Sequence, residues 1–193
     1  MSIKPIARAQ AGLSLVELVM FIVIVGIAVV SVLQVLGMGA RSSPDPMRRK
    51  QALAVAEGLM EEVRLARYTF CDGSDPKAED PTTDSPAKCG TAEGVGQEAG
   101  NSRPYDNVND YVNAFGTPLA YTTDATGNAF PAGYTATVSI VPDNTLGPAG
   151  AQIASDATAA NMNVLRITVT VSYSGGDNVV LDSYRTRYAP RSP

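Results

Sequence analysis

The sequence predicts an α+β chain in which a long N-terminal helix precedes a small antiparallel β-sheet. An apolar run extends from Leu18 to Leu33 with Ser31 as its single polar residue. Farther along the chain, apolar residues recur at spacings of three and four, which is the stripe of an amphipathic helix. Toward the C-terminus, apolar and polar residues alternate with the period of two that is typical of half-buried strands.

Composition agrees with one soluble module attached to one apolar segment. The chain has 193 residues, 45% of them hydrophobic, and a formal net charge of -4. Such a length leaves room for a single domain beyond the helix. Because the overall hydrophobicity is ordinary, the apolar excess is concentrated near the N-terminus. The acidic balance gives no polyanion-binding surface, so we expect no nucleic acid partner.

Residues 13–40 are expected to form a membrane helix, because roughly 20 apolar residues are enough to cross the hydrocarbon layer. The run is longer than the roughly 7 to 15 residues of a secretory signal core, and no good cleavage site closes its far end. Gly12, the small residue that could mark a cut, precedes the run. A cut there removes residues 1–12, with Lys4 and Arg8, and leaves the apolar helix on the protein.

Glu17 is the unusual residue of this segment. A carboxylate near hydrocarbon is costly unless it remains at the interface or finds a partner, and it therefore indicates a function. A cut after Gly12 creates an ammonium group on Leu13, about one helical turn before Glu17. The same two groups on neighbouring copies could pair when helices pack together. Cleavage would thereby be coupled to assembly.

Gly12 followed by Leu13-Ser14-Leu15-Val16-Glu17 and an apolar helix resembles the leader and methylation motif of type IV pilins and type II secretion pseudopilins. The resemblance implies the type IV pilin fold, cleavage by a prepilin peptidase after Gly12, methylation of Leu13 and a role for Glu17 in assembly. The family usually has Phe after the cut, where this chain has Leu13. The alternative is a signal anchor in which Glu17 is incidental.

The resemblance also implies location and partners. Basic residues flank the apolar run on both sides, so charge alone does not orient it. The pilin family implies a single pass through the bacterial inner membrane with a cytoplasmic N-terminus, and a place in a cell-surface pilus after assembly. The implied partners are other major and minor pilin subunits, the prepilin peptidase and the inner-membrane assembly platform.

Residues 45–70 are expected to form the amphipathic second half of the long helix. Asp45 and Pro46 are a capping residue and a first-turn proline. The apolar stripe comprises Ala52, Val55, Leu59, Val63, Ala66 and Phe70, and the opposite face carries Glu57, Glu61 and Arg64, with Glu62 toward its edge. Because Pro44 and Pro46 interrupt the helix, we expect a break near Ser42 to Asp45.

Residues 71–133 are expected to be a variable loop region tied by a disulfide. Cys71 and Cys89 flank a polar stretch, and outside the cytoplasm they are expected to pair, the alternative being two free thiols. Four aspartates at 72, 75, 80 and 84 match no calcium-loop spacing, so we interpret them as solvated charge. The apolar anchors that follow are expected to pin the loop to the sheet, or alternatively to form an exposed aromatic patch; they are Tyr105, Val108, Tyr111, Val112 and Phe115.

Residues 134–193 are expected to form an antiparallel meander. Two alternating stretches cover 134–140 and 165–173, and the turn 174–178 leads to a third strand over 179–188. The segment 142–163 has no clear period and is expected to be a long loop. The sequence has no His and no nucleophile, phosphate-binding or metal-ligand motif, so we expect no enzyme activity, cofactor or metal site.

A second, narrower resemblance covers roughly the first 70 residues and one later patch. Residues 45–57, 61–63, 68–72 and 105–111 are similar to the MshD-type minor pilins of mannose-sensitive haemagglutinin (MSHA) pili. This resemblance implies a minor pilin, structural or assembly-initiating, in an MSHA-like pilus. The alternatives are a type II secretion minor pseudopilin, a pilus adhesin that binds through loops 72–133, and a membrane-anchored enzyme, which would need a buried acidic pair.

Overall fold

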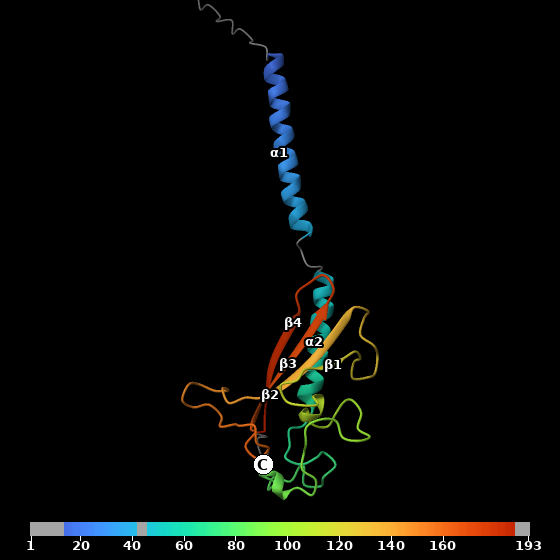
Figure 1. Cartoon of the computed structure of the whole chain (residues 1–193), viewed down its shortest axis with the longest axis vertical. Coiled ribbons are helices and arrows are strands. Elements are labelled where there is room, and N and C mark those ends of the chain that lie inside the picture. The colour runs from blue at the N-terminus through green and yellow to red at the C-terminus, as the bar shows by residue number, and fades with distance from the viewer. Residues whose placement is uncertain (1–13, 42–45, 188–193) are drawn as a thin grey trace, which may run out of the picture. The chain divides into compact units, whose positions relative to one another are not determined.

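The computed structural model of the chain describes residues 14–41 and 46–187 (Figure 1). The chain divides into two compact units, Met1–Pro44 and Asp45–Pro193. The break predicted near Ser42 to Asp45 falls on residues outside the described ranges. The fold class is α+β, with an apolar N-terminal helix in the first unit and a four-stranded antiparallel sheet in the second.

Helix α1 spans Leu15–Arg41, close to the predicted range 13–40. Ser14 caps it, because its Oγ accepts a hydrogen bond from the backbone N–H of Glu17 at 3.2 Å. Ser31 donates its hydroxyl to the carbonyl of Ile27 at 2.8 Å, so the polar residue of the apolar run is satisfied within the helix. Apolar side chains are exposed on every face from Leu15 to Leu36.

Helix α2 spans Pro46–Leu65 and begins at the predicted proline. Its buried apolar face consists of Ala52, Ala56, Leu59, Met60 and Val63. The predicted end at residue 70 is wrong, because the chain leaves the helix after Leu65 to pair with another segment. The backbone N–H of Arg67 donates to the carbonyl of Asp106 at 2.9 Å, and that of Val108 donates to Arg67 at 2.9 Å. These bonds replace the helical ones that residues 66–70 would have made.

The sheet has the strand order β1-β2-β3-β4, with every neighbouring pair antiparallel. The strands are β1 (Leu119–Tyr121), β2 (Tyr134–Pro142), β3 (Val164–Tyr173) and β4 (Val179–Thr186). The predicted meander of β2, β3 and β4 is confirmed. The long loop predicted between β2 and β3 is also confirmed, since it contains neither a helix nor a strand. Strand β1 was not predicted, because three residues are too few to display a period of two.

The core lies between α2 and one face of the sheet (Figure 1). Val138 on β2 pairs with Val169 on β3, which in turn pairs with Leu181 on β4. The two valines are fully buried and Leu181 is partly buried. Burying a Val or Leu side chain contributes about 1.5–3 kcal/mol, and a slip of one residue would turn the entire face to water. The alternation of side chains therefore determines the register.

Cys71 and Cys89 form the predicted disulfide, with their Cα atoms 5.3 Å apart. Residues next to Cys71 also pair with the far side of the loop. The N–H of Glu93 donates to the carbonyl of Phe70 at 2.9 Å, and that of Asp72 donates to Thr91 at 3.2 Å. The disulfide and these backbone bonds hold the two ends of a polar loop whose short 3-10 helix η1 spans Pro86–Lys88.

Replacing both cysteines by alanine is expected to lower the free energy of unfolding by about 3 kcal/mol, because the unfolded chain regains loop entropy. For a chain of this size the loss corresponds to a fall in Tm of about 6–12 °C. Thermal unfolding of the full chain in detergent measures this fall in Tm. A reductant should lower the Tm of the parent by a similar amount and leave the Cys71→Ala/Cys89→Ala variant unchanged. An equal Tm for the oxidised and reduced parent would contradict the stabilising role.

Candidate functional site

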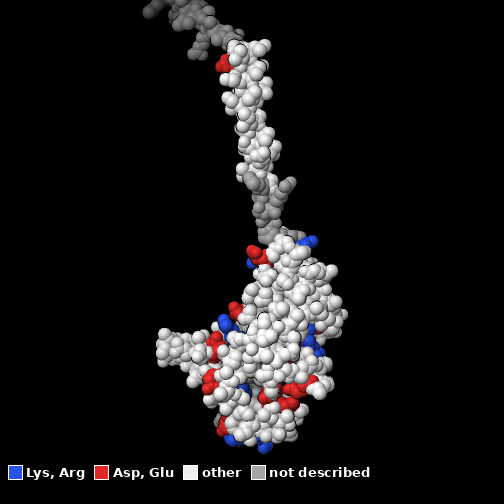
Figure 2. All heavy atoms as spheres, viewed as in Figure 1, with Lys and Arg blue, Asp and Glu red and all other residues white. Residues whose placement is uncertain are grey.

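Helix α1 carries one of the predicted site residues, Glu17. Between Leu15 and Gly37 this helix is long and apolar enough to span a membrane by length and composition. Figure 2 shows it as a surface nearly free of charged atoms, with an acidic group near its N-terminal end. Glu17 is exposed in the first turn of α1, where the positive end of the helix dipole stabilises its carboxylate. Gly12 and Leu13 lie outside the described residues, so cleavage and methylation there stay predictions.

No basic residue precedes Arg41 within α1. A cation for Glu17 in an apolar medium would have to come from outside this helix. The chain's own N-terminal segment and a neighbouring copy are two such sources. Glu17 thus has the placement that the predicted pairing between copies requires, and the pairing itself stays a prediction.

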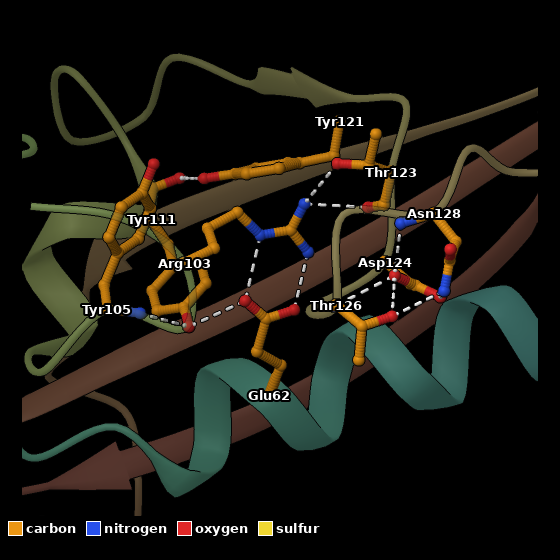
Figure 3. A network of polar contacts seen from close by, with 9 residues as sticks. All are labelled: Glu62, Arg103, Tyr105, Tyr111, Tyr121, Thr123, Asp124, Thr126 and Asn128. Atoms are coloured by element: carbon orange, nitrogen blue, oxygen red, sulfur yellow. Dashed lines mark hydrogen bonds and ion pairs between the residues drawn. The ribbon is translucent and has the colours of Figure 1, made fainter.

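The second compact unit, Asp45–Pro193, is called the globular unit below. It contains a buried ion pair that the sequence did not predict. Glu62 of α2 binds Arg103 through two parallel hydrogen bonds, from Nε to Oε1 at 2.9 Å and from Nη2 to Oε2 at 2.5 Å (Figure 3). The two side chains are only 5% and 12% exposed. The predicted position of Glu62 near the exposed face of the helix is therefore wrong. Its position seven residues after the half-buried Val55 was the available signal, because such a spacing repeats one helix face.

Arg103 joins this pair to the chain beyond β1. Its Nη1 donates to the carbonyl oxygen of Thr123 at 2.7 Å, and its guanidinium lies 4.6 Å from the centre of the Tyr121 ring. The turn that carries Thr123 is closed by Asp124, whose Oδ1 accepts the N–H groups of Thr126 and Asn128, both at 2.9 Å (Figure 3). One buried guanidinium thereby connects α2, the loop before η2 and the loop after β1.

Two tyrosines complete the network. Tyr111 donates its hydroxyl to Oε1 of Glu62 at 3.0 Å, and Tyr121 donates its hydroxyl to the carbonyl of Tyr111 at 2.8 Å. Burial, reinforced by the charge of Glu62, raises the pKa of Tyr111 well above its ordinary value, so this hydroxyl remains a donor. Besides the two bonds between Glu62 and Arg103, Tyr111 donates to the carboxylate and Thr123 accepts from the guanidinium, so both buried charges have further hydrogen-bond partners.

The apolar anchors around the 3-10 helix η2 (Val108–Tyr111) pin the loop to the core, as predicted. Val108, Tyr111 and Val112 are fully buried, and Tyr105 and Phe115 pack partly buried against the core. The alternative of an exposed aromatic patch is wrong for these residues. A binding surface formed by the loops would have to use other side chains.

Three of the four aspartates of the disulfide loop accept backbone N–H groups in turns, and the fourth, Asp84, forms an ion pair. Asp72 and Asp80 each accept the N–H of the residue two positions later, and Asp84 pairs with Lys88 at 2.9 Å. Asp75 departs from the predicted solvated charge, because it is 9% exposed and its Oδ2 accepts the N–H of Thr91 at 2.6 Å. This bond, and the one from Lys77 after it, lower the pKa of Asp75.

A different acidic cluster is brought together by the fold. Carboxylate oxygens of Glu93, Glu98 and Asp110 all lie within 4.8 Å of one another. Burial, and then the charge of Asp110, raises the pKa of Glu93 to about 9. Burial, and then the charge of Glu98, raises the pKa of Asp110 to about 7. The sequence did not predict this cluster, since the spacing of the three residues follows no known motif.

Comparisons with known proteins found no match to this chain among protein-family models, curated proteins or solved structures. The described residues establish an α+β chain with an apolar N-terminal helix, an antiparallel sheet and a disulfide. These features are compatible with a pilin-like fold.

Proposed function

We propose that this chain is a minor pilin, a structural or assembly-initiating subunit of an MSHA-like type IV pilus. The observation that supports it is helix α1, whose apolar side chains are exposed on all faces and whose sole charge before Arg41 is Glu17 in the first turn. Such a helix needs an apolar environment along its whole length. Lipid and a bundle of like helices are two such environments, and a pilin uses both in succession.

In this proposal the prepilin peptidase cleaves after Gly12 and the new N-terminus at Leu13 is methylated. Helix α1 then holds the subunit in the inner membrane. The assembly platform moves the helix from lipid into the filament core, where other pilin subunits surround it. Lipid and helix surfaces are equally apolar, so burial alone gives little preference for the filament. Glu17, paired with the N-terminus of a neighbour, supplies the directional contact.

The globular unit would lie outside the inner membrane and be carried to the pilus. The disulfide agrees with an oxidising compartment, where such bonds persist. The buried Glu62–Arg103 pair and the disulfide stabilise loops that form a large share of this unit. We assign the unit a structural role and no catalytic one.

The experiment that tests the proposal is intact-mass and N-terminal analysis of the protein extracted from membranes. Cells with a prepilin peptidase should yield a chain that starts at Leu13 and carries one added methyl group. Cells that lack the peptidase serve as the control and should yield the uncleaved chain. A start at Met1, or a start beyond residue 38, in both strains would overturn the proposal in favour of a plain anchor or a secreted domain.

A further inference from the structure

The cluster of Glu93, Glu98 and Asp110 joins two segments of the loop region. Glu93 and Glu98 belong to the segment that follows Cys89, and Asp110 belongs to η2. Three carboxylates this close repel one another when ionised, and burial strengthens the repulsion. An arrangement of this kind needs either protons or a cation to be stable. Around the cluster, the oxygens left unpaired by the described residues are acceptors that a cation could share.

The oxygens of the cluster lack donors. Asp110 is 1% exposed, its Oδ2 accepts the N–H of Asn107 at 3.2 Å, and its buried Oδ1 has no donor in the described parts of the chain; its side-chain contact is with another carboxyl group, that of Asp106. Both carboxylate oxygens of Glu93 are likewise buried and without a donor among the described residues. A buried carboxylate with no donor is unfavourable when it is ionised, so these atoms need either a proton or a positively charged neighbour.

A neutral oxygen on the residue before Asp110 also lacks a donor among the described residues. Asn109 is 5% exposed, its Oδ1 is buried without a partner in the described ranges, and it lines a cavity of about 340 Å³ that Glu93 also lines. Arg187 lines the same cavity, but its Nη1 donates to the carbonyl of Thr69 at 2.7 Å and its Nε to that of Met162 at 3.1 Å. The described structure shows no ion pair between Arg187 and Glu93. Glu93 lies within electrostatic reach of Arg187, but no hydrogen bond from the guanidinium to its carboxylate oxygens occurs among the described residues.

We propose that Glu93, Glu98 and Asp110 bind a divalent cation, and that this cation is Ca²⁺. Calcium takes oxygen ligands at about 2.3–2.6 Å, so two ligands on opposite sides of one ion lie about 4.6–5.2 Å apart, which matches the spread of the cluster. The set contains oxygen only, without the thiolate or imidazole that zinc sites use. Mg²⁺ demands a near-ideal octahedron, whereas calcium accepts an irregular set that the half-exposed Glu98 leaves open to water.

The ion would fasten the segment after the disulfide to η2. Gly96, between the two glutamates, already donates its N–H to the carbonyl of Asn109 at 3.1 Å, so the ion would reinforce an existing contact. The rigidity of the loop region would then depend on the calcium concentration of its compartment. This inference concerns the globular unit and does not depend on the proposed function.

The test uses the full chain in detergent, stripped of metal with a chelator and titrated with CaCl2. The Tm should rise saturably, with a Kd in the range of about 10⁻⁴–10⁻³ M that is typical of extracellular modules. Glu93→Gln keeps the shape of the side chain and removes one charge, so it should fold without calcium and bind calcium at least tenfold more weakly. Glu61→Gln is the matched control, because Glu61 is exposed on α2, and it should keep the full response.

Absence of a saturable calcium response in the parent would overturn the proposal, and so would an equal response in Glu93→Gln. A cluster that is neutralised by protons alone gives the first of these results. An equal response to MgCl2 would overturn the choice of calcium. Should Glu93→Gln fail to fold, Glu98→Gln replaces it, because the half-exposed Glu98 tolerates the change without a buried polar cost.

Discussion

The Glu17→Ala variant is expected to enter the membrane normally and to be lost from filaments. Helix α1 stays long and apolar enough to insert, since alanine adds no polar group. Removing one partner of a desolvated charge pair costs about 2–5 kcal/mol, which corresponds to a decrease in incorporation of more than about tenfold. Immunoblotting of sheared filaments and of the membrane fraction measures both quantities. This prediction rests on the proposed function.

Ser31→Ala provides the matched control within the same helix. Ser31 bonds to the carbonyl of Ile27 in its own helix, so its loss should leave both insertion and incorporation near the parental level. Glu17→Gln separates charge from size, and it should be lost from filaments as alanine is. Normal incorporation of Glu17→Ala would refute the pairing, whereas loss of both fractions would indicate failed insertion.

Truncation of Glu62 is expected to cause the largest loss of stability in the globular unit. The Glu62→Ala variant leaves the 12%-exposed guanidinium of Arg103 without its carboxylate, and an uncompensated buried charge costs about 3–5 kcal/mol. Tyr111 also loses the acceptor of its hydroxyl. For a chain of this size the change corresponds to a fall in Tm of about 6–20 °C. Thermal or urea unfolding in detergent would measure it.

Glu61→Ala is the control one position earlier on α2. Glu61 is exposed and lies 3.9 Å from Arg64, so its removal should change stability by no more than about 0.5 kcal/mol. The double variant Glu62→Ala/Arg103→Ala should lose less than the sum of its single variants, because the second change removes the orphaned charge. A Glu62→Ala variant as stable as the Glu61→Ala control would disprove the buried pair.

Local patterns in the sequence were sufficient for the elements that carry them. The unbroken apolar run predicted α1, and the start of α2 at Pro46 followed from its proline. The alternation of side chains predicted β2, β3 and β4, because a sheet with one buried face imposes a period of two. Cys71 and Cys89 are the only two cysteines, so once a location outside the cytoplasm was expected, a single pairing was possible, and the structure contains it.

Contacts between distant segments could not be predicted in this way. Helix α2 ends at Leu65 because residues near 107 offer backbone partners, and Glu62 is buried because Arg103 meets it from 41 positions away. The cluster of Glu93, Glu98 and Asp110 likewise exists only where two loop segments fold together. Periodicity records which side of a local element faces the core, since neighbours on a helix or strand share that face. It carries no information about which polar partner a loop brings to that face, because that partner comes from a segment far away in the sequence.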